Sequence, residues 1–135
     1  MEPITTPNAP APAGHYAQAI AHGGFLFVAG QLPLDPSSGA LIAPGDIVRQ
    51  TEATLRNVAA ILEAAGSGLD QVCSMTIYIT DRELWPRVNE TYARMLGTHR
   101  PARAVIPVPE LREGCLIEIQ AIAGVGNRES GIGNR

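Results

Sequence analysis

The sequence contains no lysine and few aromatic residues, and both shortages limit its chemistry. Its ten Lys/Arg positions are all arginine, and thirteen acidic residues outnumber them, for a formal net charge of −3. Aromatic residues make up 4% of the chain. Nucleic-acid binders usually carry a basic stripe and aromatic stacking platforms, so we expect no nucleic-acid partner. The lack of lysine excludes covalent catalysis through a lysine Schiff base.

Cysteines and long apolar runs are also scarce. Cys73 and Cys115 are too few for a disulfide scaffold and form no C-x-x-C pair, so we expect free, buried thiols. No apolar run reaches the roughly 20 residues of a membrane helix, and the opening MEPITTPNAPAPAG lacks a basic, apolar signal segment. We therefore expect a cytoplasmic protein without a membrane partner. The three histidines are scattered, which indicates no metal site.

The remaining composition is typical of one folded domain. The chain has 135 residues, of which 45% are hydrophobic and 17% charged, enough to bury a core without disulfides or metals. Residues 1–14 hold four prolines and are predicted to form a flexible Pro-rich arm, either disordered or laid along the surface. We predict a single domain over residues 15–125 and a flexible tail over 126–135.

The hydrophobic pattern predicts five strands and two helices. The first helix is expected to begin after Asp46 as N-cap and to end near Gly66, and the second to run from Asp81 to Gly97. The predicted strands are 16–21, 25–31, 72–79, 103–108 and 115–123. This β-β-α-β-α-β-β order is typical of a two-layer α+β domain, with two helices on one face of a mixed sheet.

Two helices cover only one face of such a sheet. The other face still carries Phe25, Phe27, Leu116 and Ile122. Because exposed apolar surface of this extent usually marks a partner interface, we predict a closed homo-oligomer.

Three polar residues stand where the strand pattern calls for apolar ones. Glu118 lies in the middle of CLIEIQAIA, Arg103 opens a strand after Pro101-Ala102, and Tyr16 opens the first strand. A carboxylate in a half-buried strand is costly unless it is paired or solvated. Glu118 could face solvent or form an ion pair with Arg103 between neighbouring strands, and Tyr16 could be a packing aromatic. The pattern alone leaves these alternatives open.

Six stretches together resemble the RidA/YjgF family of small enamine/imine deaminases, also labelled endoribonuclease L-PSP-like. They run in family order from about residue 9 to 124: APAGHYAQA, FVAGQLPLDPSSG, QTEATLRNVAAILEAAG, VNETYARM, PARAVIPVPEL and IEIQAIA. The resemblance implies a chorismate-mutase-like fold and a homotrimer with active sites in the clefts between subunits. It implies no metal and no organic cofactor.

The resemblance also assigns roles to individual residues. Arg103 matches the arginine that holds the substrate carboxylate, and Glu118 matches the acidic residue near the attacking water. Tyr16 matches a tyrosine of the pocket, Asn89 the asparagine of a VN-x-x-Y motif, and Gly30 the glycine of an S-G-Q motif. A guanidinium grips a carboxylate in a bidentate manner, and a carboxyl with a raised pKa exchanges protons near neutrality. The implied reaction is hydrolysis of 2-imino or 2-enamino acids, such as 2-aminoacrylate, to 2-keto acids and ammonia.

The sequence departs from the family pattern at three places. Ala29 replaces a frequent serine, Val105 a frequent cysteine, and MLGTHR is a shorter link before PAR. These changes favour bulkier or more apolar imino acids, or an aminomuconate-like product, as alternative substrates. A non-catalytic trimer that binds small carboxylates is a second reading of the function. Endoribonuclease activity is a third, which the charge of −3 and the lack of lysine disfavour.

Overall fold

The computed structural model describes residues 1–125. Two long helices and six strands follow one another along the chain, and two short 3₁₀ turns, Leu69–Gln71 and Arg82–Leu84, precede β4 and α2. The elements are β1 (Glu2–Ile4), β2 (Ala19–His22), β3 (Phe25–Gln31), α1 (Ile47–Ala64), β4 (Val72–Ile79), α2 (Trp85–Leu96), β5 (Ala102–Pro107) and β6 (Ile117–Gly124).

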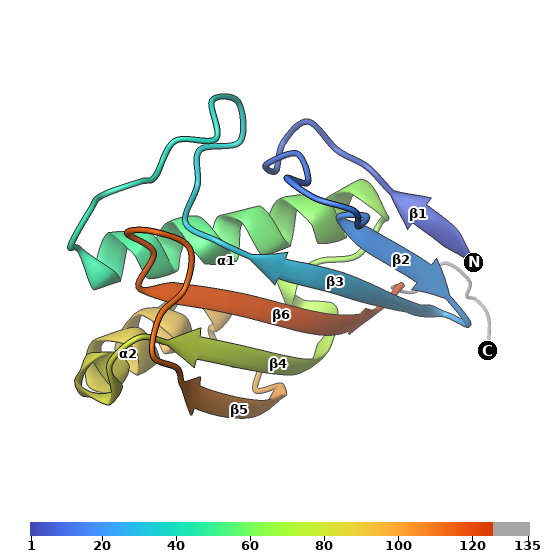
Figure 1. Ribbon diagram of the computed structural model, residues 1–135. Helices are drawn as coiled ribbons and strands as arrows, with labels where there is room; N and C mark the ends of the chain where they lie inside the picture. Colours follow the sequence, from blue (N-terminus) through green and yellow to red (C-terminus); the bar gives the residue numbers. More distant parts are fainter. Residues whose placement is uncertain (126–135) are drawn as a thin grey trace.

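The six strands form one mixed sheet in the order β1-β2-β3-β6-β4-β5. The pairing of β4 with β5 is parallel, and the other pairings are antiparallel. Both helices lie on the same side of this sheet (Figure 1). The predicted α+β class with two helices on one face is therefore confirmed.

Two helix boundaries follow capping residues of the sequence, whereas Asp81 caps the 3₁₀ turn Arg82–Leu84 and α2 begins only at Trp85. The Asp46 side chain accepts a hydrogen bond from the Arg49 N–H at 3.1 Å, which caps the start of α1. At the end of α2, Gly97 has a φ of 66°, a left-handed backbone conformation that glycine adopts with little strain. The α1 face that packs on the sheet includes Leu55, Val58 and Leu62, none of which retains exposed surface.

The predicted alternation of β4 holds except at its beginning. Met75, Ile77 and Ile79 are buried on the helix side of the sheet. The register with β6 shifts between Val72 and Ser74, so Val72 takes the buried position. Cys73 is consequently exposed, and the prediction of two buried thiols is wrong for Cys73; Cys115 is buried and both cysteines are free.

The prediction of a flexible arm over residues 1–14 is corrected for its first part. β1 pairs antiparallel with β2, and the buried Gln18 side chain holds the segment that follows. Gln18 accepts a hydrogen bond from the Thr6 N–H at 2.7 Å and donates to the carbonyls of Thr6, Ala9 and Pro10 at 3.1, 3.3 and 2.9 Å. A tertiary contact thus orders a stretch that is irregular by composition. The predicted tail lies outside the described residues.

The sheet face away from the helices, here called the open face, is partly apolar. Phe25, Phe27 and Ile106 are 46%, 45% and 40% exposed, and the cross-strand register places Ile122 beside Phe27. Phe25, Phe27 and Ile122 are among the residues predicted from the sequence to lie at an interface between copies, and that interface stays a prediction. Within residues 1–125, no helix combines the length and apolar character needed to cross a bilayer.

Replacing Gln18 with alanine tests the attachment of the arm. We expect Gln18→Ala to lower the free energy of unfolding by about 1–3 kcal/mol, because it leaves buried backbone groups unpaired. Amide exchange at Thr6 should accelerate more than exchange in β4. Gln71→Ala is the matched control, since the Gln71 side chain is half-exposed and makes no hydrogen bond to residues 1–125. Equal effects of the two substitutions would contradict this role of Gln18.

Candidate functional site

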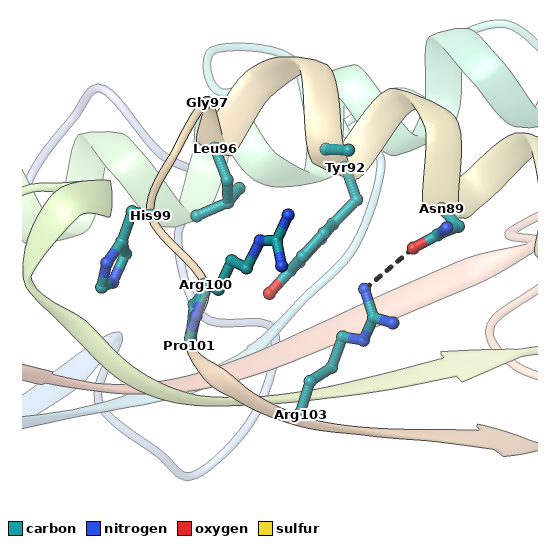
Figure 2. Close-up of a pocket in the computed structure, with 9 residues that line it drawn as sticks. Asn89, Tyr92, Leu96, Gly97, His99, Arg100, Pro101 and Arg103 are labelled. Carbon is teal, nitrogen blue, oxygen red and sulfur yellow. Dashed lines mark hydrogen bonds between the residues drawn. The ribbon is translucent and has the colours of Figure 1, made fainter.

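Arg103 projects from β5 onto one face of α2. Its strand register places it beside Met75, which is buried on the helix side. Its guanidinium donates a hydrogen bond to the Asn89 Oδ1 at 3.0 Å, and its Cζ lies 4.6 Å from the Trp85 ring centroid and 4.9 Å from that of Tyr92. These α2 residues share a helix face because they are four and three positions apart. Figure 2 shows the Arg103–Asn89 hydrogen bond.

A hollow of about 450 Å³ opens beside this arginine. It is lined by residues of α2 and of the link into β5: Asn89, Tyr92, Ala93, Leu96, Gly97, His99, Arg100, Pro101 and Arg103. Arg103 is exposed and uses part of its donor set on Asn89, so other N–H groups are free to face a ligand. Stacking and the amide contact orient the guanidinium, which suits it to bind a carboxylate.

Glu118, Gly30 and Tyr16 form a second group. With Ala29 and Leu32, they line a hollow of about 310 Å³ on the open face. The carboxylate of Glu118 covers Gly30 so closely that a Cβ at this position would overlap it unless the Glu118 side chain shifted. Glycine at this position thus allows the carboxylate to keep its place. Tyr16 is 52% exposed, and its hydroxyl accepts a hydrogen bond from the Ala13 N–H at 3.2 Å. Tyr16 is therefore not a core aromatic.

The environment of Glu118 favours its protonated form. Burial raises the pKa of this carboxyl above its ordinary value of 4.5. No residue in the described range 1–125 forms an ion pair with it, since the ion pairs found there join Glu52 to Arg56 and Arg94. A half-buried carboxyl with a raised pKa and no partner is suited to exchange protons with a bound ligand.

The two groups lie on opposite faces of the sheet. β4 separates β5 from β6, and Glu118 pairs with Tyr78, whose partner on β5 is Ile106 rather than Arg103. Arg103 points towards the helices and Glu118 towards the open face, so the ion pair considered from the sequence does not form. One copy of the chain brings Arg103 to Asn89 and Glu118 to Gly30 and Tyr16, but it does not bring the two groups together.

Sequence reasoning missed several residues around Arg103. Trp85 and Tyr92 stack on its guanidinium, and Arg100 lines the same hollow. Trp85 and Tyr92 could have been found from the sequence, because they are spaced to lie on the same helix face as Asn89. Among residues 1–125, no three His, Cys, Asp or Glu side chains gather where they could hold a metal ion.

Adding one methyl group at Gly30 tests its contact with Glu118. We expect Gly30→Ala to destabilise the fold by about 1–3 kcal/mol, because the new Cβ and the carboxylate cannot occupy the same space. The penalty should shrink when Gly30→Ala is made in a Glu118→Ala background. Chemical denaturation of the four proteins of this double-mutant cycle measures the coupling. A penalty that is unchanged by Glu118→Ala would show that Glu118 does not cause it.

The raised pKa of Glu118 predicts a pH-dependent effect on stability. The folded protein holds this proton more tightly than the unfolded chain does, so ionisation lowers stability as the pH rises from about 4.5 through the raised pKa. We expect Glu118→Gln to be more stable than the parent at pH 7, and this advantage to fade below pH 4.5. Glu110→Gln, at an exposed loop position, should show no such trend in denaturation series. A constant advantage across this pH range would refute the shift.

The family model for Endoribonuclease L-PSP matches residues 6–125. A RutC family protein from Pyrococcus horikoshii is 48% identical over 122 residues, which cover 90% of this chain and 96% of that protein. A mouse protein named 2-iminobutanoate/2-iminopropanoate deaminase is 39% identical and covers 91% of this chain and 90% of its own length.

Solved structures agree with this placement. The YjgF gene product of E. coli has a TM-score of 0.86 at 35% identity, over 92% of this chain and 98% of its own. TdcF of E. coli, solved with bound serine, has a TM-score of 0.86 at 34% identity over the same shares. The chain therefore belongs to the Endoribonuclease L-PSP family, the RidA/YjgF family that its motifs resemble.

Proposed function

We propose that this protein hydrolyses reactive 2-imino and 2-enamino acids to 2-keto acids and ammonia, in clefts between the subunits of a homotrimer. The observation that carries the proposal is the separation of Arg103 and Glu118 onto opposite faces of one sheet. Each residue lines its own hollow. A complete site needs the Arg103 side of one copy and the Glu118 side of another.

Arg103 would hold the substrate through its carboxylate. The Asn89 amide and the Trp85 and Tyr92 rings restrict the guanidinium, so little rotational freedom is lost when a carboxylate binds. A cation beside the carboxylate also keeps the anionic imino acid in place while its neutral or protonated nitrogen reacts. This grip needs no metal ion.

Glu118 would handle the protons of the reaction. In its acid form it can protonate an enamine carbon, which yields the iminium ion. As a carboxylate it can then take a proton from the water that adds to the iminium carbon. Glu118 passes this proton to the amino nitrogen of the resulting carbinolamine, and the C–N bond breaks as ammonia leaves. The hydroxyl gives its proton back to Glu118 and becomes the ketone oxygen. Burial raises the pKa of Glu118 above that of an ordinary carboxyl, which makes it a better proton donor for the first of these steps.

The open face is the surface on which we place the contact between copies. Phe25, Phe27 and Ile106 are exposed there, and the Glu118 hollow opens on the same side. Association through this face would bury the apolar side chains and carry Glu118 towards a neighbouring copy. The mouse and rat relatives named 2-iminobutanoate/2-iminopropanoate deaminase, each 39% identical, support this activity. A cytoplasmic location belongs to the same proposal.

Mixed oligomers test the shared site directly. Arg103→Ala and Glu118→Gln should each lower kcat/KM for 2-iminobutanoate by about 100-fold or more. When the two variants are co-expressed with different tags, each purified mixed trimer should regain roughly a third of its sites, because one interface pairs the two intact halves. The assay follows loss of an imine formed by an amino-acid oxidase. Inactive mixed trimers, or a monomer in solution, would contradict the shared site.

A non-catalytic trimer that binds small carboxylates is the second candidate. The replacement of polar pocket residues by Ala29, beside Glu118, and by Val105 favours it. In that case 2-oxobutanoate would bind in an Arg103-dependent manner, while imine hydrolysis would stay at the uncatalysed rate. The same measurements therefore separate the two functions.

A further inference from the structure

The link between α2 and β5 holds Arg100 at the edge of the Arg103 hollow. The Gly97 N–H donates to the Ala93 carbonyl at 3.0 Å, and the His99 Nε2 lies 2.7 Å from the Val72 carbonyl oxygen, which makes it the donor. Pro101 follows Arg100 and favours an extended backbone at that residue. The link is therefore held at Gly97 and His99 before Arg100, and at Ala102, which pairs with Ser74 of β4, after it. The Arg100 side chain lines the hollow.

The Tyr92 hydroxyl is an unpaired polar group in the same hollow. Tyr92 is 5% exposed, and its Oη has no hydrogen-bond partner in residues 1–125. Burial raises the pKa of this phenol, and the charge and close approach of the Arg103 guanidinium, which also stacks on the ring, oppose part of the shift. Buried hydroxyls are normally paired, so this one is placed to meet a ligand oxygen.

The charge of the hollow is positive. Arg100 and Arg103 both line it, and no aspartate or glutamate does. Neither arginine takes part in the ion pairs found among the described residues. Figure 2 shows the side chains of Arg100, Arg103 and Tyr92 directed into this hollow. Two cations and an unpaired hydroxyl around one hollow match a ligand with two anionic groups better than a ligand with one.

We propose that the preferred substrate is a 2-imino dicarboxylic acid, with its first carboxylate on Arg103 and its distal carboxylate on Arg100 and the Tyr92 hydroxyl. This inference rests on the proposed deaminase function and names its substrate class. A hollow of about 450 Å³ accommodates such a small molecule. Arg100 is then a specificity-determining residue, whereas Arg103 serves any 2-imino acid.

A neighbouring hollow would suit an apolar substrate rather than a dicarboxylic one. It is lined by Ile79, Trp85, Val105 and Pro107, with Arg82, and is largely apolar. A substrate with a bulky apolar side chain would use that surface. Arg103, however, lines the first hollow and not the second. A carboxylate held by Arg103 in the first hollow therefore has Arg100 and Tyr92 among the residues around it, which is why we favour the dicarboxylic class.

Substrate ratios test the inference. We compare kcat/KM for 2-iminoglutarate and 2-iminobutanoate, both formed in the cuvette by amino-acid oxidases. The parent protein should prefer 2-iminoglutarate, and Arg100→Gln should lower that preference about 10-fold or more, chiefly through KM. Tyr92→Phe should lower it about 3-fold or more without loss of thermal stability, because the hydroxyl has no partner to lose. Arg49→Gln, an exposed site on α1 outside every described hollow, should leave it unchanged.

The outcomes separate this inference from the proposed function. Hydrolysis of 2-iminobutanoate without a preference for 2-iminoglutarate overturns the inference and leaves the deaminase function standing. A preference that Arg100→Gln does not reduce also overturns it. If no imine is hydrolysed, the deaminase function fails. Calorimetry then tests, without any reaction, whether the hollow prefers a dicarboxylic ligand. Binding of 2-oxoglutarate that is tighter than that of 2-oxobutanoate and depends on Arg100 supports it, and equal binding overturns it.

Discussion

The position of β4 between β5 and β6 is the constraint on which the functional interpretation depends. Side chains along a strand alternate between faces, and the paired register transmits this alternation across the sheet. Arg103 shares a face with Met75, while Glu118 shares the other with Tyr78. No change of side-chain rotamer brings these two groups together, because the sheet itself lies between them. Any chemistry that uses both groups requires a second copy of the chain.

Regular elements could be predicted from the sequence where local signals agree. The strand 72–79 has the bounds that its alternation indicates, and α1 begins after the Asp46 cap. β1 was not predictable, because its segment is irregular by composition and is ordered by pairing with β2, which lies further along the chain. Cys73 was misplaced for a similar reason. A register shift against β6 is a property of two strands and cannot be detected in one.

The candidate site was only half accessible to sequence reasoning. A charged residue in an apolar strand is conspicuous, so Arg103 and Glu118 could be identified, but the order of the strands could not. Tyr92, in contrast, could not be identified from the sequence as a ligand-binding residue. On an amphipathic helix it is a typical core aromatic, and most of its surface is indeed buried. Its functional signal is the missing partner of one oxygen atom, which is visible only after the whole surrounding structure is known.

The strands hold the groups proposed to act on the substrate's reacting atoms, and a loop holds the residue proposed to select the substrate, because strands are more rigid than loops. Arg103 and Glu118 lie on paired strands, and each has its orientation set by a close neighbour, an aromatic face in one case and a bare glycine in the other. Groups that act on the reacting atoms benefit from such rigid support. Arg100 lies instead in a short link whose length and composition can change without disturbing the sheet. A family that keeps the same chemistry on its strands could therefore change its substrates through this link.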